Sequence, residues 1–168
     1  MNRKIRLLKG DITKLEIDAI VNAANQSLLG GGGVDGAIHK AAGPNLLEEC
    51  KTLYGCGTGN AKITNGYNLP AKYVIHAVGP VWHGGISDES EKLASCYRRS
   101  IEVADENNVK TIAFPNISTG VYGYPKEEAA KIAIKTVMDS LNEHPGIETV
   151  IFCAFDDDNY KIYKNLLK

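Results

Sequence analysis

The segment Leu28–Pro44, LLGGGGVDGAIHKAAGP, places four consecutive glycines directly before a pattern that is typical of a short helix. It follows the apolar run Ala19–Asn22, which predicts a strand. Glycine tolerates positive φ and lets another molecule approach the backbone closely. The first N–H groups of a helix have no partner within the helix and point outward, where they can bind an anion. The segment therefore predicts a strand, a glycine-rich anion-binding loop and a helix that starts near Val34.

Short apolar runs alternate with helix-like patterns along the rest of the chain. Strands are predicted at Ile5–Leu8, Ala19–Asn22, Lys62–Asn68, Tyr73–Val78, Thr111–Phe114 and Val150–Phe155. Helices are predicted around Leu93–Ala104, around Ala130–Leu141 with Pro125 in its first turn and Pro145–Gly146 at its end, and at Asp156–Lys168. This alternation predicts one α/β domain over residues 1–168, a three-layer α/β/α sandwich with a mixed, mainly parallel sheet. In such sheets ligands bind at the carboxyl ends of the strands.

The composition limits the class of protein. The chain has 168 residues, 43% of them hydrophobic and 23% charged, with a formal net charge of −1. The absence of a basic excess argues against specific nucleic-acid binding. No apolar stretch has the length of a membrane span or a signal peptide, so we expect a cytoplasmic protein, and a monomer by default.

Four cysteines, at positions 50, 56, 96 and 153, show no metal-binding spacing. We expect reduced, buried thiols and no metal. A zinc site built from Cys50, Cys56 and a histidine is the alternative.

A second glycine loop repeats the pattern of the first. The segment Asn116–Glu128, NISTGVYGYPKEE, again follows a predicted strand and precedes a predicted helix. Two such units in one small domain predict two adjacent phosphates. The chain has no Walker A sequence, and Tyr54–Asn60, where a dinucleotide-binding fold expects an acid, contains none. Neither common nucleotide motif therefore accounts for the two loops.

Five segments of the chain resemble the macro domain family, in particular its MacroD-type branch. They are GDIT at Gly10–Thr13, IVNAAN at Ile20–Asn25, the segment Leu28–Pro44, AKYVIHAVGPVW at Ala71–Trp82 and ISTGVYGYP at Ile117–Pro125. The resemblance implies a macro domain fold that binds ADP-ribose. It also implies hydrolysis of mono-ADP-ribose from acidic side chains of modified proteins and of the acyl ester of O-acetyl-ADP-ribose, without a cofactor. The implied partners are ADP-ribose, O-acetyl-ADP-ribose and mono-ADP-ribosylated proteins.

With ADP-ribose as the ligand, three residues are assigned to adenine. The carboxylate of Asp11 would accept a hydrogen bond from the exocyclic amine, and the N–H of Ile12 would serve a ring nitrogen. Phe155 would stack on the base. The alternatives are a helix or turn cap for Asp11 and a core aromatic for Phe155.

The diphosphate and the distal ribose are assigned to the two glycine loops. Backbone N–H groups of Gly32, Gly33 and Val34 would bind one side of the diphosphate, and those of Ser118, Thr119, Gly120, Val121 and Tyr122 the other. Neither loop contains Lys or Arg, which favours recognition by backbone dipoles. Asn25 would hold the ribose hydroxyls, Asn22 would brace the loop, and Tyr122 would also cover the ribose face.

Asp35 and Asn25 are the candidate catalytic residues, and Asn25 would act by positioning the sugar. The role of Asp35 follows from its place in the chain. Its position at a helix start predicts a lowered pKa, so that the carboxylate would hold or activate a water. The alternative is an N-terminal helix cap. His39, four residues later on the same helix face, is either a proton-transfer partner or a packing residue, and His76 in a buried strand is structural. Two rival functions remain: a reader that binds ADP-ribose without turnover, and an unrelated phosphatase or NAD-dependent enzyme.

Overall fold

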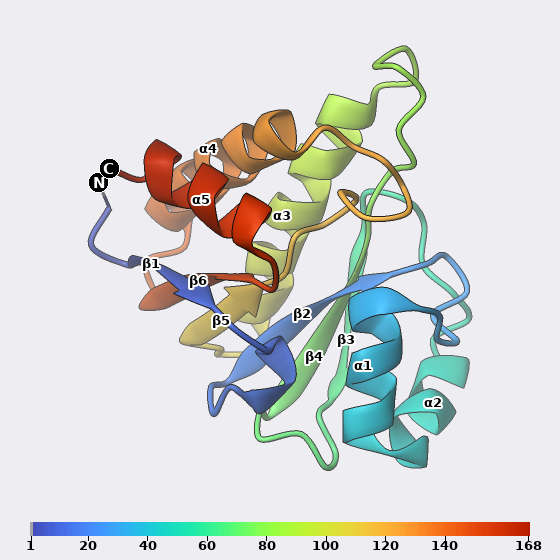
Figure 1. The fold of residues 1–168 in the computed structure, drawn as a ribbon. Coiled ribbons are helices and arrows are strands. Elements are labelled where there is room, and N and C mark those ends of the chain that lie inside the picture. Colours follow the sequence, from blue (N-terminus) through green and yellow to red (C-terminus); the bar gives the residue numbers. More distant parts are fainter. Residues whose placement is uncertain (1) are drawn as a thin grey trace.

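A six-stranded sheet forms the centre of residues 2–168, which are the residues that the computed structural model describes (Figure 1). The strands are β1 (Ile5–Lys9), β2 (Ala19–Ala24), β3 (Ala61–Asn65), β4 (Tyr73–Val78), β5 (Thr111–Phe114) and β6 (Thr149–Ala154). Their order across the sheet is β1-β6-β5-β2-β4-β3. Only β3 among them runs antiparallel to its neighbour, which confirms the predicted mixed, mainly parallel sheet.

Helices cover both faces of this sheet, as the three-layer prediction requires (Figure 1). One face carries α1 (Gly33–Ala42) and α2 (Pro44–Lys51), and the other carries α3 (Glu89–Glu106), α4 (Lys126–Glu143) and α5 (Asp157–Leu166). A short 3-10 helix, η1, spans Ile12–Lys14. Successive side chains of a strand point to opposite faces, so Ile20 packs in the core under α1 and α2 while Val21 packs in the core under α3 to α5.

Most predicted elements are confirmed, and their ends differ for local reasons. The strand predicted to reach Asn68 ends at Asn65, because the Gly66 N–H bonds to the Lys72 carbonyl and closes a turn. Pro125 is the N-cap of α4 instead of lying in its first turn. The sixth strand ends at Ala154, one residue before Phe155. Helix α2 was not predicted. No helix within residues 2–168 has the length and apolar character to cross a membrane.

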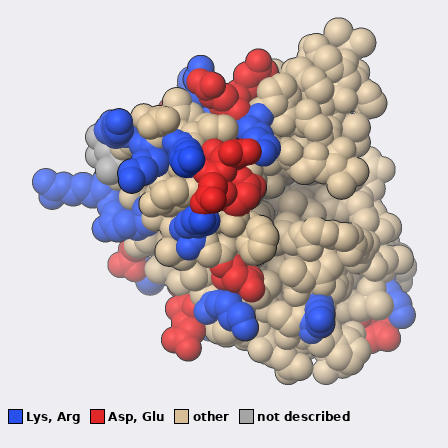
Figure 2. Space-filling model, in the orientation of Figure 1, with Lys and Arg blue, Asp and Glu red and all other residues tan. Residues whose placement is uncertain are grey.

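The connections create a crevice between β2 and β5. These two strands are neighbours, but the chain leaves β2 for α1 on one face and leaves β5 for α4 on the other (Figure 1). Ligands of open α/β sheets bind where the connections diverge in this way. Figure 2 shows a hollow between the loop after β5 and the start of α1, and its floor shows neither Lys nor Arg. The fold thus brings the two predicted glycine loops together around one depression.

Candidate functional site

The loop after β2, residues 25–32, is held in shape by the side chain of Asn25. Its amide oxygen accepts hydrogen bonds from the Ser27 hydroxyl (2.6 Å) and the Leu28 N–H (3.2 Å), and its Nδ2 donates to the Gly30 carbonyl (2.9 Å). Leu28 has a φ of 61°, which these bonds stabilise. The structure therefore gives Asn25 the bracing role that the sequence assigned to Asn22. One N–H of its Nδ2 remains for a ligand.

The glycines of this loop have separate reasons to be glycine. A Cβ on Gly36 would lie 2.6 Å from the Gly31 carbonyl oxygen, so Gly36 lets the loop fold directly onto α1. Gly33 has a φ of 56°, which disfavours other residues. A Cβ on Gly32 or Gly33 would meet nothing within 4 Å, so both face open space. The N–H groups of Gly33 and Val34 belong to the first turn of α1, where no helical partner exists.

The loop after β5 presents a second run of backbone donors. Ser118 has a φ of 67°, and its carbonyl accepts the Tyr124 N–H at 2.9 Å, which curls the loop back on itself. Within residues 2–168, no backbone hydrogen bond involves the N–H of Ser118, Thr119, Gly120, Val121 or Tyr122. A Cβ on Gly79 would overlap the Ser118 hydroxyl, so the end of β4 supports this loop by direct contact.

A third loop, residues 79–88, packs against the loop after β5 and supports it. The Trp82 N–H donates to the Tyr122 carbonyl (2.8 Å), and the ring of Trp82 packs on Tyr124 with 4.6 Å between centroids. Three backbone N–H groups of this loop bind the buried carboxylate of Glu89, those of His83 (2.7 Å), Gly85 (2.9 Å) and Ser87 (2.5 Å). Burial alone would raise the pKa of Glu89, but these hydrogen bonds lower it to about 2. The supporting role of Trp82 was not predicted because its partners Tyr122 and Tyr124 are distant in the chain. The role of Glu89 was not predicted either, although its three partners lie two to six residues before it.

Asp35 lies in the first turn of α1, and its side chain is buried, with 5% of the residue exposed. Its Oδ1 accepts a hydrogen bond from Asn22 Nδ2 at 2.8 Å and lies 3.5 Å from His39 Nε2. Its Oδ2 faces the glycine loop, since a Cβ on Gly31 would lie 3.0 Å from it. One carboxylate oxygen is thus fixed by the protein, and the other points toward the loop.

Two expectations about Asp35 are wrong. Burial raises its pKa, and this effect outweighs the hydrogen bond from Asn22 and the charge of His39, so the pKa is raised and not lowered. The helix-cap alternative also fails, because the N-cap of α1 is Gly32, which forms no side-chain cap.

Asn22 differs from its expected role, whereas His39 fits both of the roles left open for it. Asn22 is 0% exposed in β2, so it supports Asp35 from beneath instead of bracing the loop or contacting the substrate. The packing interpretation of His39 accounts for its partly buried ring, but its Nε2 lies close enough to Asp35 for proton exchange through a small shift.

The residues predicted for adenine lie at the carboxyl ends of β1 and β6, which are neighbouring strands. Asp11 caps η1 by accepting the N–H (2.9 Å) and hydroxyl (2.6 Å) of Thr13, and these bonds lower its pKa. The cap alternative is therefore confirmed, while its ligand role stays a prediction. Ile12 has a buried side chain. Phe155 is 79% exposed, so the core alternative for Phe155 is wrong and its ring is free to stack.

The four cysteines are buried free thiols. Burial raises the pKa of Cys50 to about 11, which keeps this thiol protonated. Within residues 2–168, no cluster of three or more His, Cys, Asp or Glu side chains has an arrangement that could hold a metal ion.

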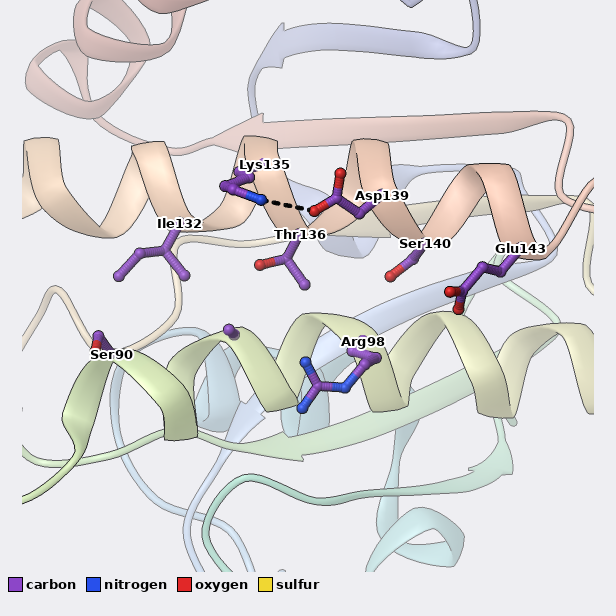
Figure 3. Close-up of a pocket in the computed structure, with 9 residues that line it drawn as sticks. Ser90, Arg98, Ile132, Lys135, Thr136, Asp139, Ser140 and Glu143 are labelled. Atoms are coloured by element: carbon purple, nitrogen blue, oxygen red, sulfur yellow. Dashed lines mark hydrogen bonds and ion pairs between the residues drawn. The ribbon is translucent and has the colours of Figure 1, made fainter.

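A cavity of about 320 Å³ lies between α3 and α4, on the face opposite α1 (Figure 3). It is lined by Ser90 and Arg98 of α3 and by residues of α4 that include the Lys135–Asp139 ion pair (2.9 Å). None of the predicted site residues lines it.

Known proteins resemble this chain in sequence and structure. The family model described as Macro domain matches residues 21–133. A macro domain-containing protein of Chlorobaculum tepidum is 63% identical over 99% of this chain and 96% of its own length. The ADP-ribose glycohydrolase MACROD2 of Homo sapiens is 57% identical over 98% of this chain, which spans 39% of that protein.

Solved structures show the same fold. The Trypanosoma brucei macrodomain in complex with ADP-ribose superposes with a TM-score of 0.94 at 47% identity, over 99% of this chain and 70% of that one. The Oceanobacillus iheyensis macrodomain with ADP gives a TM-score of 0.89 at 45% identity, over 96% and 88% of the two chains. Two glycine loops at the β2–β5 crevice, a matching family model and these relatives lead to one conclusion: this chain belongs to the macro domain family.

Proposed function

We propose that this chain binds ADP-ribose and hydrolyses the bond between its distal ribose and an acyl group, either an acidic side chain of a modified protein or the acetyl group of O-acetyl-ADP-ribose. The observation that carries the proposal is the buried Asp35 carboxylate, whose Oδ2 faces Gly31 of the loop after β2, in a fold that also presents the free backbone N–H groups of the loop after β5. The names of the MACROD2 relatives and the ADP-ribose complex of a structural neighbour support it.

The order of the strands matches the parts of this ligand. Asp11 and Phe155 at β1 and β6 would receive adenine, and the loop after β5 would lie next along the sheet. The loop after β2 would bind the other side of the diphosphate with the N–H groups that open α1. The distal ribose would then lie over Gly31, against Asp35 Oδ2 and the remaining N–H of Asn25.

The raised pKa of Asp35 makes its carboxylate a better general base than an ordinary aspartate. In the proposed step, Asp35 Oδ2 accepts a proton from a water as the water oxygen bonds to a carbon of the ester linkage, either the acyl carbon or the ribose carbon. The bond from that carbon to the ester oxygen breaks, and the oxygen that leaves takes the proton from Asp35, which becomes a carboxylate again. The products are ADP-ribose and a free carboxylic acid. His39, 3.5 Å from Oδ1, is placed to exchange that proton with Asp35.

The spacing of altered residues in one relative also supports Asp35 and Asn25. The O. iheyensis macrodomain was solved as variants of an asparagine, a glycine and an aspartate, the first two lying ten and three residues before the aspartate. Asn25 and Gly32 precede Asp35 by the same spacings.

Substitution of Asp35 distinguishes a hydrolase from a reader. We expect Asp35→Ala to lower kcat for release of ADP-ribose from a modified glutamate by about 100-fold or more, because the base is lost. Binding of ADP-ribose should stay within about threefold by calorimetry, since the diphosphate loops remain. Wild-type activity in Asp35→Ala would remove Asp35 from the mechanism. A wild-type protein that binds ADP-ribose without turnover would identify a reader.

Comparison of ligands tests the rival enzyme classes. ADP-ribose should raise Tm more than NAD, AMP or phosphate at equal concentration, because only ADP-ribose would fill both loops and the ribose end. Equal shifts from all four would favour a phosphatase or an NAD-dependent enzyme.

We also propose that residues 1–168 act as a single monomeric domain in the cytoplasm. Four unpaired thiols, which a reducing compartment would maintain, support this location. Light scattering would test the monomer, and a dimer at micromolar concentration would contradict it.

A further inference from the structure

A row of buried polar side chains crosses three neighbouring strands directly beneath Asp35. It consists of Asn22 on β2, His76 on β4 and Thr64 on β3, each no more than 2% exposed. Asn22 and His76 are paired in the parallel register of β2 and β4. By strand alternation they share the face of Ile20 and Val74, whose core packs under α1 and α2. The row is therefore built into the buried face of the sheet under α1 and α2.

The hydrogen bonds of this row allow one assignment of donors and acceptors. Asn22 Nδ2 lies 2.8 Å from Asp35 Oδ1 and 3.2 Å from His76 Nδ1, and its two hydrogens serve these two acceptors. His76 Nδ1 must then be unprotonated, so the ring proton is on Nε2, 3.0 Å from the Thr64 hydroxyl. That hydroxyl donates to the Asn65 carbonyl at 3.1 Å. This single tautomer of His76 is consistent with every hydrogen bond of the row.

The ionisable groups around Asp35 are consistent with that tautomer. Burial lowers the pKa of His76 to about 3, so the ring is neutral at physiological pH. Cys50 of α2, 3.8 Å from His76 Nε2, remains a protonated thiol because burial raises its pKa. His39 on α1 is the other titratable group facing Asp35, and residues 25–32 carry no charge.

A core-filling role leaves the polarity of this row unexplained. Buried polar side chains in a sheet stabilise a fold no better than apolar ones of similar volume. Asn22 Oδ1 also lacks a partner within residues 2–168, which is a further cost in stability. Outside the sheet the row contacts the protonated thiol of Cys50, 3.8 Å from His76 Nε2, and the Asp35 carboxylate, which accepts a hydrogen bond of 2.8 Å from Asn22. The polarity of the row is therefore explained by its hydrogen bond to that carboxylate.

We propose that His76 is a positioning residue: its Nδ1 fixes the Asn22 amide so that Nδ2 holds Asp35 Oδ1, which leaves Oδ2 alone to meet the substrate. This inference rests on the proposed hydrolase function. Without the Nδ1 acceptor the Asn22 amide can turn, and Asp35 loses the hydrogen bond that fixes its orientation and favours its ionised form.

Two substitutions at position 76 test the role of the Nδ1 acceptor. His76→Leu removes the acceptor and keeps an apolar side chain of similar bulk, whereas His76→Asn keeps an oxygen near the place of Nδ1. We expect His76→Leu to lower kcat by about tenfold or more with KM within about threefold, because ligand binding is untouched. The pKa of Asp35, followed by carbon-13 NMR of its carboxyl, should rise. His76→Asn should restore most of the wild-type kcat and should return the pKa of Asp35 most of the way to its wild-type value.

A matched control separates positioning from stability. Val137→Ala makes a cavity in α4 on the opposite face, so it lowers Tm without altering kcat or the pKa of Asp35. Where His76→Leu does not fold, Thr64→Val provides the test, because it removes the hydroxyl that contacts His76 Nε2 and keeps the side chains of His76 and Asn22. It should lower kcat by about threefold and raise the pKa of Asp35 in the same direction.

Several results at position 76 would contradict the proposal. The proposal is overturned if His76→Leu retains the wild-type kcat, or if its Asp35 carboxyl titrates as in the wild type. It is also overturned if His76→Asn is as impaired as His76→Leu. A wild-type protein that hydrolyses nothing would refute the proposed function, and the carboxyl titration would then decide whether His76 positions Asp35.

Discussion

Asp35 lies where two electrostatic effects oppose each other. The first turn of a helix favours a carboxylate by roughly 0.3–1 kcal/mol, and that effect was the basis of the sequence prediction. Removal of the same carboxylate from water disfavours its charge, and in this structure that desolvation dominates. Helix position can be deduced from local sequence, but burial depends on strands β2, β3 and β4 beneath it. A raised pKa is therefore a property that local sequence could not predict.

The raised pKa of Asp35 has a measurable effect on stability. Between the ordinary aspartate pKa near 4 and the raised value, the folded state binds more protons than the unfolded state. The free energy of unfolding should therefore decrease as pH rises through this window. Asp35→Asn should remove that decrease and be more stable than the wild type at pH 7, by about 0.5–2 kcal/mol, in urea titrations at several pH values.

The exposed Asp139 in α4 supplies the control for this measurement. Asp139→Asn should leave the pH dependence of the wild type unchanged, since its carboxylate is solvated. An Asp35→Asn protein whose stability follows the wild-type curve across this pH window would mean that the buried carboxylate carries no charging penalty.

Phe155 also acts at the scale of one residue. Its ring is exposed beside the carboxyl end of β6, and stacking on a base is worth ~1–3 kcal/mol. Phe155→Ala should weaken ADP-ribose binding by roughly 5- to 150-fold in calorimetry, while Tm of the free protein stays constant. Met138→Ala, at a partly exposed apolar residue of α4, should change neither quantity by much. Unchanged affinity in Phe155→Ala would place adenine elsewhere.

At the scale of elements, the site depends on loops that fit against one another. A Cβ on Gly79 would overlap the Ser118 hydroxyl and lie 2.6 Å from Ile117 Cγ2. Gly79→Ala should therefore push the β5 loop out of place, at a loss of about 1–3 kcal/mol of stability and about tenfold or more in ADP-ribose affinity. Gly57→Ala is the matched control, since its Cβ would meet nothing within 4 Å. Similar affinities for the two variants would show that the contact does not position the loop.

The sequence predicted elements best where the signal was local. Apolar runs such as Tyr73–Val78 identified the buried strands, and the glycine loops identified the crevice. Helix α2 was missed because only Leu46 and Cys50 are buried in its eight residues, too few for a clear helical period. The role of Asn22 was misassigned because it depends on the pairing of Asn22 with His76, a register that joins residues far apart in the chain.

At the scale of the whole molecule, the fold keeps Lys and Arg side chains away from the floor of the site. The chain has 19 Lys and Arg and 20 Asp and Glu, yet the floor of the hollow shows neither Lys nor Arg (Figure 2). The two glycine loops, residues 25–33 and 116–123, likewise contain no charged side chain. An anionic ligand would thus be held by short hydrogen bonds from fixed backbone N–H groups. Such contacts act at close range, whereas salt chiefly screens exposed charges that interact over a Debye length, about 10 Å at 0.1 M.

This difference predicts a weak salt dependence of ADP-ribose affinity. Between 50 and 500 mM NaCl the Kd of the wild-type protein should change by no more than about threefold, because no exposed cation contributes to binding. Val121→Lys introduces such a cation at a fully exposed position of the β5 loop. This variant should bind more tightly than the wild type at 50 mM NaCl and lose that advantage at 500 mM. Calorimetry at both salt concentrations would measure how the Kd of each of the two proteins changes with salt. A wild-type affinity that falls by tenfold or more would show that side-chain charges, and not the backbone of the two loops, hold the diphosphate.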